Sequence, residues 1–316
     1  MDLDVVLLVR AAELRRKRDG GAFLRLALGD RSGQVTALLW DGVAEVEALC
    51  RPGRPVRVAG RFERHARWGP QIAVRAVGEP PLGSFELADL VDGPAHAVGE
   101  LEAQLDDLLA TIRDPHLRAL LDRVLGPHTE TGRRYRTAPA AKHYHQAYVH
   151  GLLEHSVSVA EGVHALANGG SFPGIDHDIA VTGALLHDVG KLEAYTADLV
   201  CIDLTDAGRL QGEIPLGYYR IRRAIEDIPG FPPATAQAVL HIILSHHGSL
   251  EHGSPVVPCT REATLVHHVD NLGGRLGSFD RLEKALPPGQ SWTPFDRAIG
   301  SSAYFGPPVA EERQAA

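Results

Sequence analysis

The first eighty residues alternate between apolar and polar positions in short runs, which predicts a series of β-strands. Glycine and proline mark turns between the runs, at 30–33 and at 51–53. A short helix is expected at 41–49, after the third run. The predicted strands are 4–14, 21–29, 34–40, 55–63 and 70–77.

Five strands with one helix between the third and the fourth is the order of elements in an OB-fold barrel, so we expect this all-β fold for residues 1–80. The stretch FLRLALGDRSGQVTALLW also resembles the second and third strands of nucleic-acid-binding OB-folds. Trp40 and Phe62 are expected in the core rather than in a stacking platform. Alternation directs Leu24, Leu26, Leu28, Val56 and Val58 inward and leaves Phe23, Arg25, Arg57 and Arg61 on the outer face.

The outer face of the predicted barrel combines arginine with aromatic side chains. Proteins hold single-stranded nucleic acid in this way, through phosphate contacts and base stacking. The alternative is a solvated surface without a ligand. Residues 1–80 carry 14 Lys and Arg against 10 Asp and Glu, whereas the whole chain has a net charge of −8. The excess of positive charge therefore coincides with the predicted barrel, and the rest of the chain carries −12.

After residue 80 the pattern changes from strands to helices. A linker rich in proline and glycine is expected at 81–97, and apolar positions recur at helical spacing in 98–112 and 115–125. We therefore expect two domains, the barrel and an all-α helical bundle at 98–286. The tail, 287–316, is expected to pack against the bundle or a neighbouring subunit, with 309–316 disordered.

Composition narrows the class of protein. No stretch approaches eighteen uninterrupted apolar residues and no basic leader opens the chain, so we expect a cytoplasmic protein without a membrane partner. Cys50, Cys201 and Cys259 form no C-x-x-C pattern, which argues against a disulfide framework and a zinc knuckle. Of the 17 histidines, 13 lie between His143 and His268.

These histidines accompany carboxylates on several predicted helices, as the ligands of a metal in a helical bundle do. A buried carboxylate beside imidazoles is costly unless it is paired or coordinated. Imidazole and carboxylate ligands suit Mn, Fe, Co, Ni or Zn better than Mg. The alternative for the adjacent pair, His246 and His247, is a helix C-terminus where imidazoles meet the helix dipole. The candidate ligands are His155, His187, Asp188, His246, His247 and Asp270.

The order His155, His187-Asp188, Asp270, with LLHDVGK around the pair, resembles the HD-domain phosphohydrolase superfamily, in which these positions hold the first metal. Within it, the barrel and the stretches PAAKHYHQAYVHGLLEHSVSV, LSHHGSLEHGSP and VDNL are similar to the YhaM-type 3′-5′ exoribonucleases. The resemblance covers nearly the whole chain. It implies a metal-dependent exonuclease that releases nucleoside monophosphates from single-stranded RNA, with single-stranded DNA as a second candidate substrate.

One position departs from this pattern. Two-metal members of the superfamily carry a histidine in a Gly-His-Ile context where this chain has Glu213. The resemblance then implies a second metal held by Glu213, His246 and His247, with Asp188 bridging both ions. Because Glu213 adds an oxygen ligand, the metal preference of this second site would shift toward Mn or Mg. The alternative is that Glu213 is an ordinary surface residue, so the chain is expected to bind one or two divalent ions, with Mn favoured.

Further residues near the ligands are candidates for catalysis and for RNA contact. Lys191 lies one helical turn beyond Asp188 and can reach a phosphate oxygen, although it can equally be a solvated charge. Asp188, Lys191 and His150 are the expected catalytic residues, the histidine as a proton donor to the 3′ leaving oxygen. The expected RNA contacts before the first ligand are Lys142, His143 and His145.

Two other functions remain open from the sequence. An HD phosphohydrolase acting on a nucleotide or cyclic dinucleotide would suit the −12 charge of residues 81–316, since a long polyanion prefers a basic channel. A single-strand-binding protein with a degenerate metal site is allowed by Glu213, but the intact His187-Asp188 pair and Lys191 argue against it. The sequence leaves open whether the chain forms a homo-oligomer.

Overall fold

Two units, each with its own apolar core, make up the described part of the chain. Among the described residues, the first unit comprises those from 1 to 93 and the second comprises those from 94 to 306. The computed structural model describes residues 1–17, 20–65, 69–91, 93–142, 146–170, 172–196, 202–287 and 289–306.

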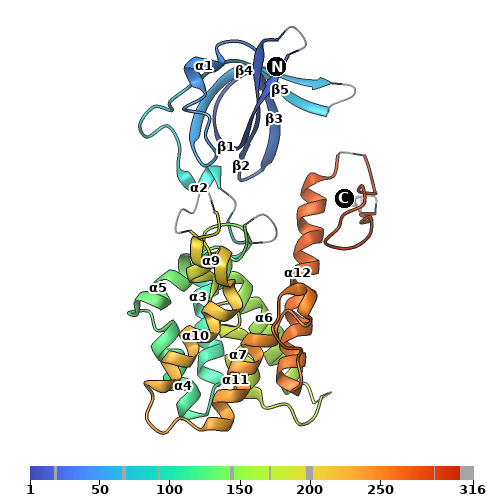
Figure 1. Ribbon diagram of the computed structural model, residues 1–316. Helices are drawn as coiled ribbons and strands as arrows, with labels where there is room; N and C mark the ends of the chain where they lie inside the picture. The colour runs from blue at the N-terminus through green and yellow to red at the C-terminus, as the bar shows by residue number, and fades with distance from the viewer. Residues whose placement is uncertain are drawn as a thin grey trace, which may run out of the picture. The chain divides into compact units, whose positions relative to one another are not determined.

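The first unit is a closed five-stranded barrel with the strand order β1-β2-β3-β5-β4, completed by pairing of β1 with β4 (Figure 1). Among the described strands, β3 and β5 pair in parallel and the other neighbours pair antiparallel. The ladder shifts register at Gly60, where a Cβ would lie 2.5 Å from the carbonyl oxygen of Ala73. Such bulges bend strands and help a sheet to close. The elements are β1 Asp2–Arg16, β2 Ala22–Asp30, β3 Gly33–Leu39, α1 Val43–Val46, β4 Pro55–His65 and β5 Gly69–Gly78.

The predicted alternation along the strands is confirmed, with one correction. Leu24, Leu26, Leu28, Val56 and Val58 are all buried in the barrel core, and Arg25, Arg57 and Arg61 are exposed. Trp40 was expected in the core, but it is 44% exposed and stacks on Phe23, with ring centroids 4.5 Å apart. The reason is strand alternation, because its neighbour Leu39 is buried. Phe62 is partly buried and packs against the core, as expected.

Part of the segment expected as a linker is instead folded onto the barrel. It forms α2 (Leu87–Leu90), and Leu90 is buried. The Arg10 guanidinium donates a hydrogen bond to the Leu90 carbonyl at 3.0 Å, and the Arg31 N–H donates to the Asp89 carbonyl at 3.0 Å. These contacts with backbone carbonyls hold residues 87–90 against the strands of the barrel.

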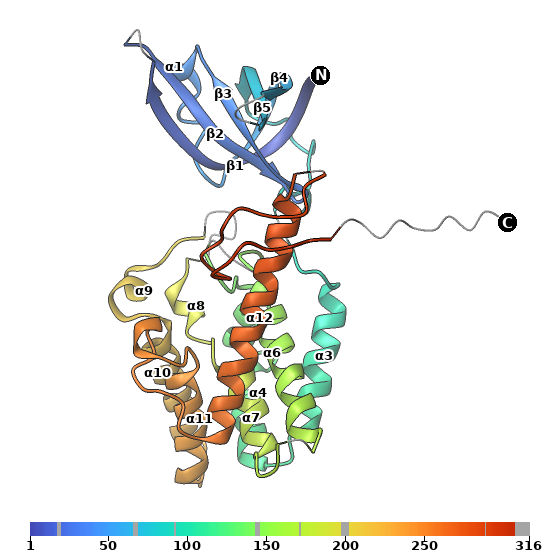
Figure 2. The same cartoon turned by 90° about the vertical axis from the view of Figure 1, so that its right-hand side faces the viewer.

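The second unit is helical, with α6 packed against α3, α7 and α12 (Figure 2). The predicted break between the first two helices is confirmed, because the Asp114 side chain caps α4 by accepting the N–H groups of His116 and Leu117. The helices are α3 Val98–Thr111, α4 Pro115–Leu125, α5 Glu130–Thr137, α6 Gly151–Asn168, α7 His177–Leu186, α8 Lys191–Ala194, α9 Asp206–Gln211, α10 Glu213–Glu226, α11 Pro233–Ser245, the 3₁₀ turn Leu250–His252 and α12 Arg261–Ala285.

The tail packs against α12, as expected of a segment joined to the bundle. Arg281 on α12 forms an ion pair with Asp296 at 2.8 Å, and the rings of Phe279 and Phe305 meet edge to face. Residues 307–316, which include the segment expected to be disordered, lie outside the described residues. No helix in the described part of the chain is long and apolar enough to cross a membrane.

Candidate metal centre

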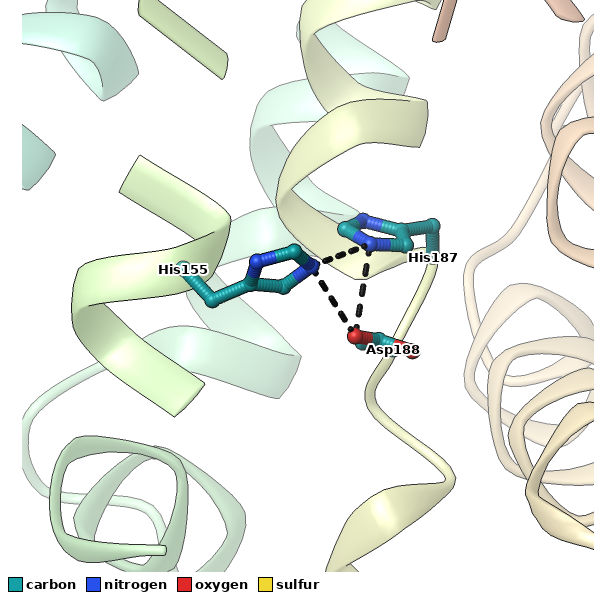
Figure 3. A group of neighbouring side chains, drawn as sticks. All are labelled: His155, His187 and Asp188. Carbon is teal, nitrogen blue, oxygen red and sulfur yellow. Dashed lines mark hydrogen bonds and ion pairs between the residues drawn. The ribbon is translucent and has the colours of Figure 1, made fainter. Parts of the chain in front are cut away.

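Three helices bring four predicted ligands to one buried point. His155 lies on α6, His187 caps the C-terminus of α7 and Asp188 follows it, and Asp270 lies on α12 beyond the buried Ala263 and Val266 of the same face. Figure 3 shows His155, His187 and Asp188 pointing toward one another. The imidazoles and the Asp188 carboxylate are almost inaccessible to solvent.

The donor atoms of these residues have the spacing of a coordination shell. The Nε2 atom of His155 lies 3.2 Å from His187 Nε2, 3.2 Å from Asp188 Oδ2 and 3.1 Å from Asp270 Oδ1. The Nε2 atom of His187 lies 3.4 Å from Asp188 Oδ2 and 3.8 Å from Asp270 Oδ1. Ligands about 2.0–2.2 Å from one ion are separated by roughly 3.0–3.5 Å. One divalent ion therefore fits among these four side chains.

Hydrogen bonds to the backbone orient the imidazoles. The Nδ1 atoms of His187 and His246 lie 2.7 Å and 2.8 Å from the carbonyl oxygens of Ala184 and Ile243. A carbonyl oxygen only accepts, so both Nδ1 atoms carry the hydrogen, and in the neutral ring the Nε2 atom presents the lone pair that a metal ion needs. His246 Nε2 and Asp188 Oδ1 are buried and have no hydrogen-bond partner among the described residues. Such orphaned polar atoms fit a bound cation.

The charges at this point also favour a cation. Burial alone would raise the pKa of the Asp188 carboxyl, but the ammonium of Lys191 and the neighbouring imidazoles hold it well below its usual value. Burial alone would lower the pKa of His155, but hydrogen bonds with Asp188 and Asp270 raise it to about 9. The two carboxylates that raise the pKa of His155 would equally stabilise a bound metal ion, and a metal ion binds the deprotonated form of the ring.

Lys191 contacts the centre through Asp188. Its Nζ atom lies 2.6 Å from Asp188 Oδ2, and its side chain is largely buried. The ammonium group of Lys191 therefore lies at the edge of the candidate metal centre. Its contact with a phosphate oxygen stays a prediction.

A second group of donors begins at the other oxygen of Asp188. Asp188 Oδ1 lies 3.6 Å from His246 Nε2, and the rings of His246 and His247 have centroids 4.3 Å apart. His247 Nε2 lies 3.7 Å from Glu213 Oε1, so the structure places the unusual glutamate beside this pair. The His247 Nδ1–H donates to the His252 carbonyl at 2.9 Å. Asp188 thus presents one oxygen to each group.

The other predicted site residues lie outside these groups in their described contacts. His150 has a left-handed backbone (φ 69°), and its Nδ1 lies 2.6 Å from the Arg136 carbonyl oxygen. Lys142 forms an ion pair with Asp203 at 2.7 Å. His143 and His145 lie outside the described residues. Their roles stay predictions.

Three supporting residues were not expected from the sequence. Glu154, buried beside His155, accepts hydrogen bonds from the Ala95 N–H and the Tyr148 hydroxyl. The buried Tyr135 hydroxyl donates to the Leu185 carbonyl at 2.9 Å, and His267 Nδ1 donates to the His246 carbonyl at 2.7 Å. Each joins segments distant in sequence, so no local pattern could identify it.

Gly190, in the HDVGK stretch, allows α8 to pack closely on α10. A Cβ there would lie 1.9 Å from the Glu213 carbonyl oxygen and 2.5 Å from the Gly217 nitrogen, both backbone atoms. Gly190→Ala is therefore expected to lower the free energy of unfolding by about 1–3 kcal/mol and to displace Glu213. Urea denaturation measures the change.

The control for this substitution is Gly273→Ala, within α12, where a Cβ meets nothing within 4 Å. It is expected to leave stability unchanged or to raise it by up to about 1 kcal/mol. Equal stability of Gly190→Ala and the unsubstituted chain would contradict the close packing of α8 on α10.

Comparison with known proteins agrees with this geometry. Residues 152–274 match the HD domain family, and this range contains every candidate metal ligand. Two curated relatives are named 3′-5′ exoribonuclease YhaM. The one from Geobacillus sp. (strain WCH70) is 28% identical over 306 residues, which cover 96% of this chain and 92% of the relative. The one from Bacillus licheniformis is 28% identical over 308 residues, which cover 96% and 95%. No solved structure matches the chain.

Proposed function

We propose that this chain, which is similar over 96% of its length to two proteins named 3′-5′ exoribonuclease YhaM, is a metal-dependent 3′-5′ exonuclease of single-stranded RNA that releases nucleoside monophosphates. The observation that carries the proposal is Asp188, which is buried within the HD-domain match and offers one oxygen to each of two donor groups. Single-stranded DNA is the second candidate substrate.

The donor set is suited to one or two divalent ions. His155, His187, Asp188 and Asp270 would hold the first, and Glu213, His246 and His247 would hold the second, with Asp188 shared. Mn is favoured because nitrogen and oxygen donors are mixed, and Fe, Co, Ni, Zn and Mg are the alternatives. When bound, such ions supply positive charge against the phosphodiester and lower the pKa of water.

The protein's own residues would orient the substrate and handle charge and protons. Lys191 places an ammonium beside Asp188, where it can contact a non-bridging phosphate oxygen. His150 would donate a proton to the 3′ leaving oxygen. Its left-handed backbone supports a functional role, because such conformations in non-glycine residues cluster at active sites.

The barrel would hold the RNA strand as an OB-fold. Its closed five-stranded order, with α1 between β3 and β4, supports that assignment. On its surface, the exposed Trp40 stacks on Phe23, and the ammonium of Lys17 lies 5.9 Å from the Trp40 ring centroid. A base can stack on this exposed ring while a phosphate meets the nearby positive charge.

The arginines of the outer face are paired with carboxylates of the barrel. Arg57 donates two hydrogen bonds of 2.7 Å to Asp4, and Arg25 and Arg61 lie 3.5 Å and 3.8 Å from Glu13 and Glu63. All three pairs are exposed, and exposed ion pairs contribute little stability. A phosphate can therefore displace the carboxylates and take up these guanidinium groups.

Trp40→Ala is expected to weaken binding of single-stranded RNA about 10-fold, since one stacked base contributes ~1–3 kcal/mol. Fluorescence anisotropy at constant salt measures the affinity in a catalytically inactive background. Trp292→Ala is the matched control, because it removes an exposed tryptophan from the second unit. Equal RNA affinities of the two variants would show that Trp40 is not part of the RNA-binding face.

The activity itself is tested with a 5′-labelled single-stranded RNA and added Mn, beside the same RNA blocked by a 3′-phosphate. The expected result is a ladder that shortens from the 3′ end, slower on the blocked RNA and absent with chelator. Binding without cleavage in Mn, Co, Ni, Zn or Mg would overturn the proposal.

A further inference from the structure

A second histidine cluster lies at the opposite ends of the two helices that carry His155 and His187. His164 lies on the last turns of α6, and His177 and Asp178 open α7. These helices lie side by side (Figure 2). His164 follows His155 by nine residues and His177 precedes His187 by ten. At a rise of about 1.5 Å per residue the cluster is roughly 13–15 Å along the helices from the metal centre, and is therefore a separate site.

The side chains of the cluster are linked in series by hydrogen bonds that run from the backbone through Asp178 and His177 to His164. Asp178 Oδ2 accepts the N–H groups of Arg113 and Asp114 at 2.6 Å and 2.8 Å, which orients the carboxylate. Asp178 Oδ1 lies 2.9 Å from His177 Nδ1, and His177 Nε2 lies 2.9 Å from His164 Nδ1. A carboxylate only accepts, so His177 Nδ1 carries the hydrogen and His177 Nε2 presents its lone pair to His164.

A cavity of about 340 Å³ adjoins these side chains. Its lining includes His164, His177 and Asp178, together with Thr111, Arg113 and Asn168. The Asn168 amide lies 3.3 Å from the His164 ring, and turning the amide over presents its oxygen instead of its nitrogen. The cavity has room for several water molecules, each of about 30 Å³.

We propose that His164 and His177 bind a divalent transition-metal ion of the Zn, Ni or Cu type, with Asp178 as a positioning residue behind His177. A carboxylate that accepts from the second nitrogen of a histidine is the usual support of a metal-bound imidazole. Two such ligands, about 2.0–2.1 Å from a tetrahedral ion, lie ~3.3 Å apart. The two imidazole nitrogens, now 2.9 Å apart, need to separate by only a few tenths of an ångström.

The remaining coordination positions would be taken by water from the cavity and by the Asn168 oxygen. Imidazole pairs bind Zn, Ni and Cu far better than Mn, which stands at the weak end of the series. The ion would join α6 to α7 at the ends remote from catalysis. Its expected role is therefore to stabilise this helix pair, independently of the exonuclease activity.

The test counts zinc equivalents on the full-length, chelator-stripped protein by competition with a chromophoric chelator. His164→Gln and His177→Gln are each expected to lose one zinc equivalent while keeping activity in Mn, because neither residue lies in the catalytic centre. Glutamine can still hydrogen-bond to the neighbouring ring, which favours folding of both variants. His128→Gln is the control, because His128 is exposed and lies on another segment, between α4 and α5.

Asp178→Asn separates positioning from ligation. It is expected to keep the zinc equivalent but to weaken its binding about 10- to 100-fold. A readout without substitution is modification by diethyl pyrocarbonate, from which zinc should protect His164 and His177. Unchanged stoichiometry and affinity in both glutamine variants, or modification unaffected by saturating zinc, would overturn the site and leave the cluster as a structural hydrogen-bond chain.

Discussion

Asp188→Asn is expected to lower kcat/KM for single-stranded RNA by about 10³-fold or more, with little change in fold. Both carboxylate oxygens of Asp188 face other candidate metal ligands. Oδ2 lies near the Nε2 atoms of His155 and His187, and Oδ1 lies near that of His246. Asparagine has the same shape as aspartate but carries no negative charge. Its NH₂ group would also point toward the imidazole lone pairs of one of the two donor groups. Losing charge stabilisation of several kcal/mol corresponds to this factor, since ~1.4 kcal/mol changes a rate tenfold.

The measurement combines a time course of 3′-end shortening with the metal content of the purified variant. The metal content should fall together with the rate, because Asp188 is shared between the two donor groups. Asp106→Asn is the control, an exposed aspartate on α3 in the same unit. Activity of Asp188→Asn within about tenfold of the unsubstituted enzyme would show that Asp188 is not a metal ligand.

Removal of residues 1–93 is expected to lower hydrolysis of a long single-stranded RNA about 100-fold and that of a small chromogenic phosphodiester less than about threefold. Two stacked bases contribute ~2–6 kcal/mol to strand binding, and the barrel carries the candidate stacking and arginine residues. The second unit has its own core and keeps the hydrogen bond from the Ala95 N–H to Glu154. Its catalytic donors should therefore stay assembled without the barrel.

The truncated protein is compared with the full chain by circular dichroism, Mn binding and rates on both substrates at several salt concentrations. The rate on RNA should also lose part of its salt dependence, since phosphate contacts are removed. A dinucleotide, too short to span the barrel, is the control substrate. Equal rates of both proteins on long RNA would show that the barrel does not hold the substrate.

The barrel illustrates which structural features a local sequence pattern can predict. Alternation along each strand determined which side chains enter the core, because successive residues of a strand face opposite sides. The same rule places Trp40 outside once Leu39 is inside. The expectation of a buried Trp40 did not apply this rule. The packing of α2 on the barrel was not predictable, because it depends on Arg10, about eighty residues away, reaching the Leu90 carbonyl.

The candidate metal centre also combines features that the local sequence predicts with features that depend on contacts between distant segments. From the sequence alone, His155, the His187-Asp188 pair and Asp270 could be named as candidate ligands on helices, because imidazoles and carboxylates occur there among apolar positions at helical spacing. The packing of separate helices was needed to show which oxygen of Asp188 meets which imidazole, that Glu213 lies beside His247, and that His164 meets His177. These contacts join separate helices, so their distances depend on packing between segments that no local periodicity describes.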